Sequence, residues 1–230
     1  MKFGVVTFPG SNCDYDAYRA VIDSLGEDAV YIWHKDHDLQ NSDVIILPGG
    51  FSYGDYLRPG AIARFSPVMT EVVQHARRGG PVMAICNGFQ IACEAGLLPG
   101  ALLRNASLQF VSAPLNLRIE NADTMFTSAY EEHEVIRVPI AHGDGRYTAS
   151  EHELDTLEGA GRIVFRYVDA KGEITNSANP NGSARNIAGI VNAEGNVLGM
   201  MPHPERALDD LLGSHDGLGL FESILSRVAA

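Results

Sequence analysis

A single cysteine stands where an apolar run meets an amphipathic segment. The stretch is PVMAICNGFQIACEAG, residues 81–96, with Cys86 at the junction. A nucleophile at a sharp strand-to-helix turn projects from the carboxyl end of a sheet, and the strained turn requires small neighbours, here Ala84 and Gly88. The helix N-terminus beyond favours a thiolate. Cys86 is therefore a candidate nucleophile, with a buried core cysteine as the alternative interpretation.

The other two cysteines suit this chemistry less well. Cys13 also follows an apolar run, but the adjacent Asp14 and Asp16 disfavour a thiolate. Cys93 lies two helical turns beyond Cys86 among apolar residues, which favours a packed side chain. Three cysteines without a CxxC pair indicate neither a disulfide framework nor a zinc cluster.

A thiolate nucleophile needs a base, and His203 has the most suitable setting among the eight histidines. GMMPHPER, residues 199–206, places it just past an apolar run and between two prolines that fix the backbone. Glu205 can point the same way in an extended segment and hold the imidazole. A surface loop is the alternative for an isolated His-x-Glu. With Cys86, the pair forms a nucleophile, a base and an orienting carboxylate.

A glycine-rich segment, LPGGFSYGDYLRPGAIAR at residues 47–64, follows another apolar run. It lacks the Gly-Lys-Ser/Thr ending of a phosphate loop and the Gly-x-Gly-x-x-Gly spacing of a dinucleotide site. Because the run before it predicts a strand, we expect the segment at the same sheet edge as Cys86. Its glycines would let backbone N–H groups approach a substrate oxygen.

The pattern along the chain predicts an α/β fold with a mostly parallel central sheet flanked by helices, flavodoxin-like, in one domain over residues 1–230. The predicted parallel strands are 3–8, 43–50 and 81–86, and the helices that follow them are 14–26, 60–80 and 87–96. The predicted antiparallel additions are 108–120, 133–143, 162–169 and a hairpin over 186–205, with a closing helix over 215–229. The polar stretch 176–186 favours a solvated turn over a substrate loop.

Composition limits the classes of function. The chain has 230 residues, 45% hydrophobic and 20% charged, which is ordinary for a soluble globular protein. It has neither a membrane-length apolar run nor a signal peptide, so we expect a cytoplasmic protein. A net charge of −12 disfavours nucleic-acid binding. HKDH at 34–37 has no further ligand group beside it, so we expect no metal site.

Five segments together resemble a known family. ICNGFQ and PHPER resemble the nucleophile and His/Glu motifs of the class I (triad) glutamine amidotransferases. Within that class, FPGSNCDYD, PGGFSYGDYLRPGAIAR, AICNGFQ, AHGDGRY and MPHPER resemble the glutaminase subunits of phosphoribosylformylglycinamidine synthases, from purine biosynthesis. The resemblance runs from end to end of the chain. Ala84 departs from the glycine common in the wider class, and alanine is still small enough for the turn.

The resemblance implies a role for each matching position. It makes Cys86 the nucleophile, His203 the general base and acid, and Glu205 the residue that orients the imidazole. The backbone N–H groups of Gly50 and Asn87 would form the oxyanion hole. The residues that would contact L-glutamine are Gln90, His142, Gly143 and Asp144.

The resemblance also implies partners. L-Glutamine would be hydrolysed to glutamate through a cysteinyl thioester, and the ammonia would pass to a separate ATP-dependent synthetase subunit that binds formylglycinamide ribonucleotide. A small third subunit would complete the complex. No cofactor is expected on this chain, because ATP and Mg²⁺ are used by the synthetase and the sequence has no P-loop.

Two other functions remain open from the sequence. A stand-alone hydrolase with the same triad, such as a γ-glutamyl peptidase, would act on glutamine without a partner and would cleave γ-glutamyl peptides. A non-catalytic interaction module would keep only the fold, and the intact set of Cys86, His203 and Glu205 argues against it.

Cys86→Ala is expected to abolish glutamine hydrolysis and leave the fold intact, since the thiol is the only nucleophile in the elbow. Turnover and far-UV circular dichroism of Cys86→Ala and of the control Cys13→Ala would measure this. A glutamine-analogue electrophile should label Cys86 alone. Activity retained in Cys86→Ala but lost in Cys13→Ala would contradict the assignment.

Overall fold

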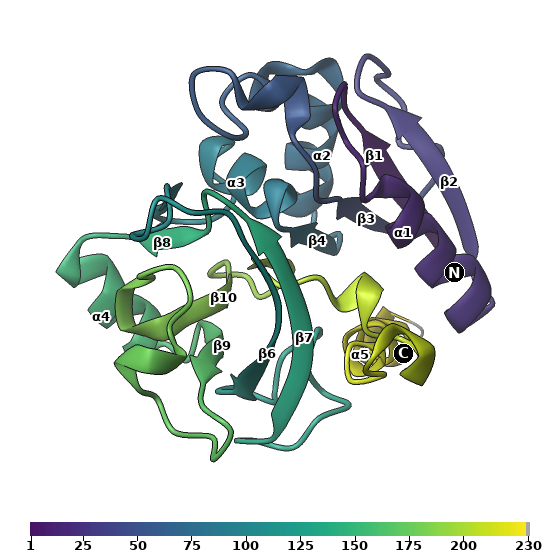
Figure 1. The fold of residues 1–230 in the computed structure, drawn as a ribbon. Coiled ribbons are helices and arrows are strands. Elements are labelled where there is room, and N and C mark those ends of the chain that lie inside the picture. The colour runs from purple at the N-terminus through teal and green to yellow at the C-terminus, as the bar shows by residue number, and fades with distance from the viewer. Residues whose placement is uncertain (229–230) are drawn as a thin grey trace.

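The computed structural model describes residues 1–228, and its core is a large mixed sheet (Figure 1). The strands of this sheet are β1 Lys2–Thr7, β2 Asp28–Trp33, β3 Val44–Leu47, β4 Val82–Ile85, β6 Val111–Ile119, β7 Val135–His142, β9 Ile163–Val168, β10 Ile187–Val191 and β11 Val197–Met200. Within the described residues these nine strands are ordered β2-β1-β3-β4-β11-β10-β9-β6-β7. The α/β fold class predicted from the sequence is confirmed.

The half of the sheet from β2 to β11 is parallel, and helices cover both of its faces. The helices are α1 Asp14–Arg19, α2 Pro67–Arg77, α3 Asn87–Glu94 and α5 Leu218–Val228. In Figure 1, α2 and α3 lie together on one face, and α1 and α5 lie on the other. The strands β3 and β4 are buried along their whole length, as expected for a doubly covered parallel sheet.

The other half of the sheet is antiparallel. β10 and β11 form the predicted hairpin, and β9, β6 and β7 extend the sheet beyond it. A small antiparallel pair, β5 Ala101–Leu103 with β8 Arg146–Thr148, lies beside helix α4 Glu151–Gly159. The antiparallel additions predicted from alternating residues are thus present.

Parallel topology brings three loops to one edge of the sheet. β3, β4 and β11 are neighbours and run in the same direction, so their carboxyl ends meet. The segments that leave these ends carry Gly50, Cys86 and His203. The sheet therefore gathers residues that lie more than 150 positions apart in the sequence.

The predicted helix 60–80 is wrong in its first part. The α-helix begins only at Pro67, after a short 3-10 turn at Ala63–Phe65. Ser66 is extended, with φ −62° and ψ 140°, because a proline disfavours the helical conformation of the residue before it. The predicted helix 215–229 starts at Leu218, and Ala229 lies outside the described residues.

Sequence reasoning also missed β2, β5, β8 and α4. β2 is an edge strand whose apolar run, residues 29–33, is mostly partly or fully exposed, unlike the buried runs of the central strands. The prediction of one domain over 1–230 stays a prediction.

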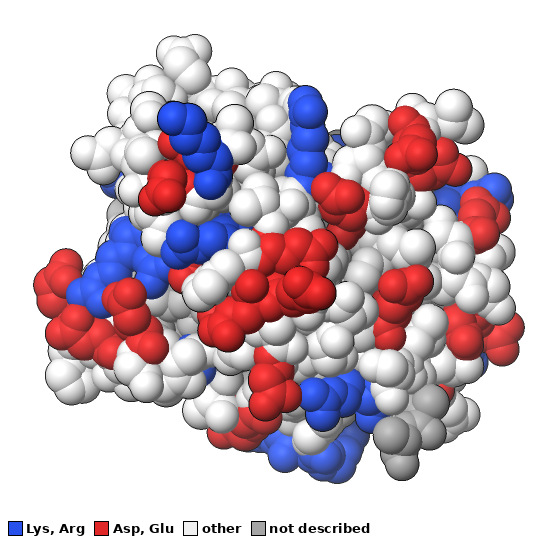
Figure 2. All heavy atoms as spheres, turned by 90° about the horizontal axis from the view of Figure 1, so that it is seen from below, with Lys and Arg blue, Asp and Glu red and all other residues white. Residues whose placement is uncertain are grey.

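The surface carries the acidic excess of the sequence. In the view of Figure 2, acidic side chains gather across the middle of the face, with basic side chains around them. Within residues 1–228, every helix is too short or too polar to cross a lipid bilayer.

Candidate active site

Cys86 occupies the turn between β4 and α3 in a backbone conformation that L-residues rarely adopt. Its φ is +52° and its ψ −105°, and its backbone N–H donates to the Met200 carbonyl on β11 at 2.7 Å. Such strain is typical of sites where the surrounding structure holds a functional residue in place. The side chain is buried, with 5% exposed. The strained elbow expected from the sequence is therefore present.

The small neighbours of Cys86 are required by packing. A Cβ on Gly88 would lie 2.0 Å from the Leu47 carbonyl oxygen on β3, so α3 approaches the sheet too closely for any side chain there. Ala84 is fully buried in β4, between the paired residues Leu47 and Gly199. These contacts explain why alanine is accepted at one position and glycine is needed at the other.

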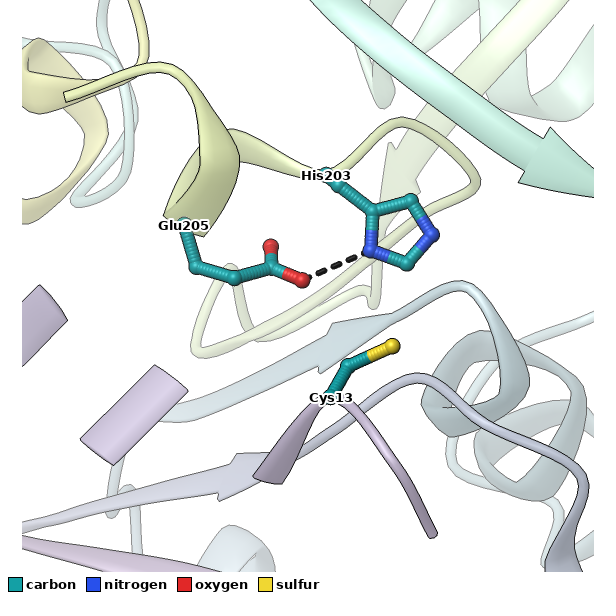
Figure 3. Close-up of side chains that lie close together, drawn as sticks. All are labelled: Cys13, His203 and Glu205. Atoms are coloured by element: carbon teal, nitrogen blue, oxygen red, sulfur yellow. Dashed lines mark hydrogen bonds and ion pairs between the residues drawn. The ribbon is translucent and has the colours of Figure 1, made fainter. Parts of the chain in front are cut away.

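His203 and Glu205 form a buried ion pair (Figure 3). The Nδ1 atom of His203 lies 2.6 Å from Glu205 Oε1, and both side chains are 1% exposed. The His203 backbone N–H donates to the Pro139 carbonyl on β7 at 2.8 Å. Because Nδ1 faces the carboxylate, Nε2 is free for chemistry, and within the described residues it has no hydrogen-bond partner.

Charge around the imidazole stabilises its protonated form. Burial alone lowers the pKa of His203, but the negative charges of Glu205 and then Cys86 outweigh burial and raise it well above its usual value. An imidazolium beside a thiol favours the thiolate, as in cysteine hydrolases. His203 is thus arranged to hold a proton that a leaving group can accept.

Cys13 lies against the same histidine. Its Sγ and the nearest side-chain atoms of His203 and Glu205 are all within 4.8 Å of one another, and Figure 3 shows the thiol directed toward the imidazole. Arg206 donates from Nη2 to Cys13 Sγ at 3.2 Å and from Nε to Asp16 Oδ2 at 2.8 Å. Sequence reasoning weighed only the acidic neighbours of Cys13 and missed this arginine, which is distant in the chain.

The same three residues are the group that could hold a metal ion in the described part of the chain. Their donors are a thiol, an imidazole and a carboxylate, which zinc accepts. Two of the three already pair with each other at 2.6 Å, so a metal would compete with the ion pair. The expectation of no metal site stays a prediction.

The two residues predicted to form the oxyanion hole flank the thiol. Gly50 has φ +140°, and a Cβ there would lie 2.8 Å from the Asn12 backbone nitrogen, so only glycine fits. Asn87 is the first residue of α3, where backbone N–H groups have no intrahelical acceptor. Within the described residues, neither of the two N–H groups donates a hydrogen bond to the protein. Both are therefore available to a developing oxyanion.

A small cavity of about 110 Å³ opens onto Cys86. Gln90 is held at its wall, donating from Nε2 to the Asp144 carbonyl at 2.6 Å and accepting at Oε1 from Asn87 Nδ2 at 2.8 Å. Every predicted substrate contact lies on this cavity. Its lining residues are Gly50, Phe51, Asp55, Cys86, Gln90, Phe110, Ala141, His142, Gly143 and Asp144.

Both ring nitrogens of His142 contact asparagine side chains. Nδ1 lies 3.2 Å from Asn105 Oδ1, and Nε2 lies 3.4 Å from Asn181 Nδ2. Burial, with the nearby positive charge of His203, lowers the pKa of His142 to about 4, so this ring is neutral near pH 7. The predicted solvated turn at 176–186 is wrong in its second half, because Asn181 is buried against this ring.

The end of β7 lies beside both the nucleophile and the base. His203 and Glu205 border a second, larger cavity of about 590 Å³, and Ala141 lines both cavities. The Cys86 thiol lies 3.8 Å from the Ala141 carbonyl oxygen. The base and the nucleophile thus lie against the same strand, His203 through Pro139 and Cys86 through Ala141.

The comparison with family models agrees with this geometry. Residues 1–216 match the model of the CobB/CobQ-like glutamine amidotransferase domain. The chain belongs to this amidotransferase family. Curated relatives named phosphoribosylformylglycinamidine synthase subunit PurQ are 58% identical in Chlorobaculum tepidum, over 98% of this chain and 97% of the relative, and 56% identical in Salinibacter ruber, over 99% and 97%.

Solved structures of amidotransferases superpose on the chain. The structure of PurLQS from Thermotoga maritima contains a chain that is 47% identical, with a TM-score of 0.88 over 99% of this chain and 98% of that one. A glutamine amidotransferase from the same organism is 15% identical, with a TM-score of 0.60 over 99% and 97%. The second likeness concerns the fold alone.

Gly88→Ala is expected to destabilise this amidotransferase by about 1–3 kcal/mol or more, because the added methyl overlaps a backbone oxygen that cannot move. Gly159→Ala is the control: a Cβ at that helical position meets nothing within 4 Å, so we expect up to about 1 kcal/mol of stabilisation. Chemical denaturation measures both. Equal stability of the two variants would contradict the packing argument.

Glu205→Gln is expected to reduce glutamine turnover by roughly ten- to hundredfold. His203→Ala is expected to reduce it more, since the imidazole moves the proton while the carboxylate only orients the imidazole. Glu205 opposes the effect of burial on the imidazolium, so its loss lowers the pKa of His203. The alkaline limb of the kcat/KM profile should therefore move to lower pH. Equal losses at saturating glutamine, or an unmoved limb, would contradict these roles.

Proposed function

We propose that this chain is the glutaminase subunit of a phosphoribosylformylglycinamidine synthase in purine biosynthesis. It hydrolyses L-glutamine to glutamate and ammonia and supplies the ammonia to an ATP-dependent synthetase subunit. That subunit converts formylglycinamide ribonucleotide to formylglycinamidine ribonucleotide. The observation that carries the proposal is the sequence identity of 58% and 56% to relatives of that name, over nearly the full length of the chain. The Cys-His-Glu set at one edge of the sheet supports it.

The chemistry follows from the charges at the elbow. The Cys86 thiolate attacks the carboxamide carbon of L-glutamine, and the carbonyl oxygen becomes an oxyanion. The N–H groups of Gly50 and Asn87 stabilise that oxyanion, and one such donor is typically worth about 3 kcal/mol. His203 gives its proton to the departing nitrogen, and ammonia leaves a glutamyl thioester.

The second half of the reaction uses the same groups. His203, now neutral, accepts a proton from water, and the hydroxide that forms attacks the thioester carbon. The carbon–sulfur bond breaks, glutamate leaves, and the thiolate and imidazolium are restored. Glu205 stabilises the imidazolium in both halves, since it is buried 2.6 Å from Nδ1.

The partner of this chain is proposed from its relatives. The PurLQS structure supports assembly with a synthetase subunit and a small third subunit, because one of its chains matches this one over nearly the full length of both. No cofactor is assigned to this chain, and ATP and Mg²⁺ belong to the synthetase. A cytoplasmic location is proposed because the supply of ammonia to a nucleotide-biosynthetic enzyme takes place where its substrates are made.

The isolated chain is expected to be a poor glutaminase that its synthetase activates. Unregulated hydrolysis would lose glutamine, and ammonia free in neutral water becomes ammonium, which is not a nucleophile. Docking should raise the population of the competent state of the loop at 49–52 and the Cys86 elbow. Turnover of the chain alone, then with synthetase, nucleotide and ribonucleotide, measures this. Full turnover by the lone chain would favour a stand-alone hydrolase.

A further inference from the structure

Three polar side chains from distant segments meet at the glycine-rich loop that carries Gly50. The Tyr53 hydroxyl lies 2.7 Å from His34 Nδ1 and 2.8 Å from Ser66 Oγ. His34 and Ser66 are both buried, His34 just past the end of β2 and Ser66 directly before α2. We call these three residues the Tyr53 cluster. The cluster lies outside the set of residues that line the cavity beside Cys86.

The side chain of Ser66 does not make the bond that is usual at its position. Ser66 precedes the first turn of α2, where a serine side chain normally accepts from a backbone N–H of that turn. Within the described chain its side chain makes no such bond, and the Val68 N–H donates instead to the His34 carbonyl at 3.2 Å. The Ser66 hydroxyl is therefore available to Tyr53.

The hydroxyl of Tyr53 acts both as a donor and as an acceptor. Burial lowers the pKa of His34, so its ring is neutral near pH 7. A neutral imidazole has one acceptor nitrogen, and Nδ1 faces the Tyr53 hydroxyl, which donates to it. The same oxygen then accepts from the Ser66 hydroxyl. The rings of Tyr53 and His34 also meet edge to face, with their centroids 5.5 Å apart.

The backbone of Tyr53 has a conformation that a bulky residue rarely adopts. Its φ is +54° and its ψ is +27°. Such strain persists only where surrounding contacts fix it. Tyr56 and Leu57, further along the loop, are exposed, so their side chains do not fix it. The contacts that do are the Tyr53 cluster and the hydrogen bond from the Tyr53 N–H to the Pro9 carbonyl at 2.6 Å.

The segment that the Tyr53 cluster holds is joined to both of the proposed oxyanion donors. Gly50 lies three residues before Tyr53 in the same loop. Ser52, next to Tyr53, donates from its backbone N–H to Asn87 Oδ1 at 3.1 Å. A shift of the Tyr53 side chain would therefore move the loop relative to the N–H groups of Gly50 and Asn87.

We propose that Tyr53, held by His34 and Ser66, is a positioning residue that sets the geometry of the oxyanion hole. The inference rests on the proposed function, in which the N–H groups of Gly50 and Asn87 stabilise the oxyanion formed from glutamine. Tyr53 acts through the loop and not by contact with the reacting atoms. Its loss should weaken the stabilisation of the oxyanion and leave the thiolate as nucleophilic as before.

Tyr53→Phe removes the hydroxyl and keeps the ring against His34. In the chain assembled with its synthetase, kcat for glutamine should fall about tenfold, as expected for the loss of a buried hydrogen-bonded hydroxyl. That is less than the roughly 100- to 1,000-fold loss that follows when an oxyanion donor is removed outright. KM should stay near its wild-type value, because the oxyanion forms only after glutamine has bound.

Alkylation by iodoacetamide separates the oxyanion hole from the nucleophile. The Cys86 thiolate displaces iodide from the CH₂ carbon and no oxyanion forms, so this reaction reports on the thiolate alone. The rate of Cys86 alkylation, followed by mass spectrometry of its peptide, should be the same in Tyr53→Phe and in the wild type. Tyr31→Phe, a control at an exposed tyrosine of β2, should change neither this rate nor glutamine turnover.

Ser66→Ala tests the Tyr53 cluster from its other side. It removes one of the two partners of the Tyr53 hydroxyl and should reduce kcat about threefold. The double variant Tyr53→Phe/Ser66→Ala should be no slower than Tyr53→Phe alone, because the two changes remove the same interaction. Losses that multiply in the double variant would show that the two side chains act independently, and would overturn the inference.

The remaining outcomes separate this inference from the function on which it rests. If the wild-type complex fails to hydrolyse glutamine, the proposed function is wrong and the inference falls with it. If the wild type hydrolyses glutamine and Tyr53→Phe is equally fast, the hydroxyl does not position the oxyanion hole. An equal loss of turnover and of alkylation in Tyr53→Phe would mean that Tyr53 supports the whole elbow, and would also overturn the inference.

Discussion

The backbone conformation of Cys86 is the constraint on which the site depends. A residue at φ +52° and ψ −105° costs of order 1–3 kcal/mol and persists only where its surroundings allow no alternative. Here the constraint is the close approach of α3 to β3 at Gly88, together with the hydrogen bond from the Cys86 N–H to β11. Both contacts therefore help to hold Cys86 in this conformation.

The buried His203–Glu205 ion pair is the second constraint on the fold, because its two charges must stay paired in the interior. Removing one partner of such a pair typically costs about 3–5 kcal/mol, because the other charge is left unpaired in the interior. The pair sits on a loop that β7 holds through a backbone hydrogen bond to Pro139. The antiparallel half of the sheet therefore holds the proposed base against the parallel half, which carries the proposed nucleophile.

Polarity divides the site into two environments. Glu205 and Cys86 stabilise the imidazolium of His203, while burial keeps His142 neutral in the cavity beside Cys86, which Asp55 and Asp144 also line. Positive charge is thus found at the His203 imidazole and is absent from the lining residues of the cavity beside Cys86 within the described chain.

The sequence by itself determined the central strands, the elbow and the candidate set of Cys86, His203 and Glu205. These features depend on local pattern: buried apolar runs, small residues around Cys86, and His and Glu two positions apart. The tertiary structure alone decided the contact of Arg206 with Cys13, the bracing of His142 by Asn181, and the place of Asp55 in the cavity. Each joins segments that are distant in sequence, and a polar side chain carries no local sign of whether its partner is water or another buried group.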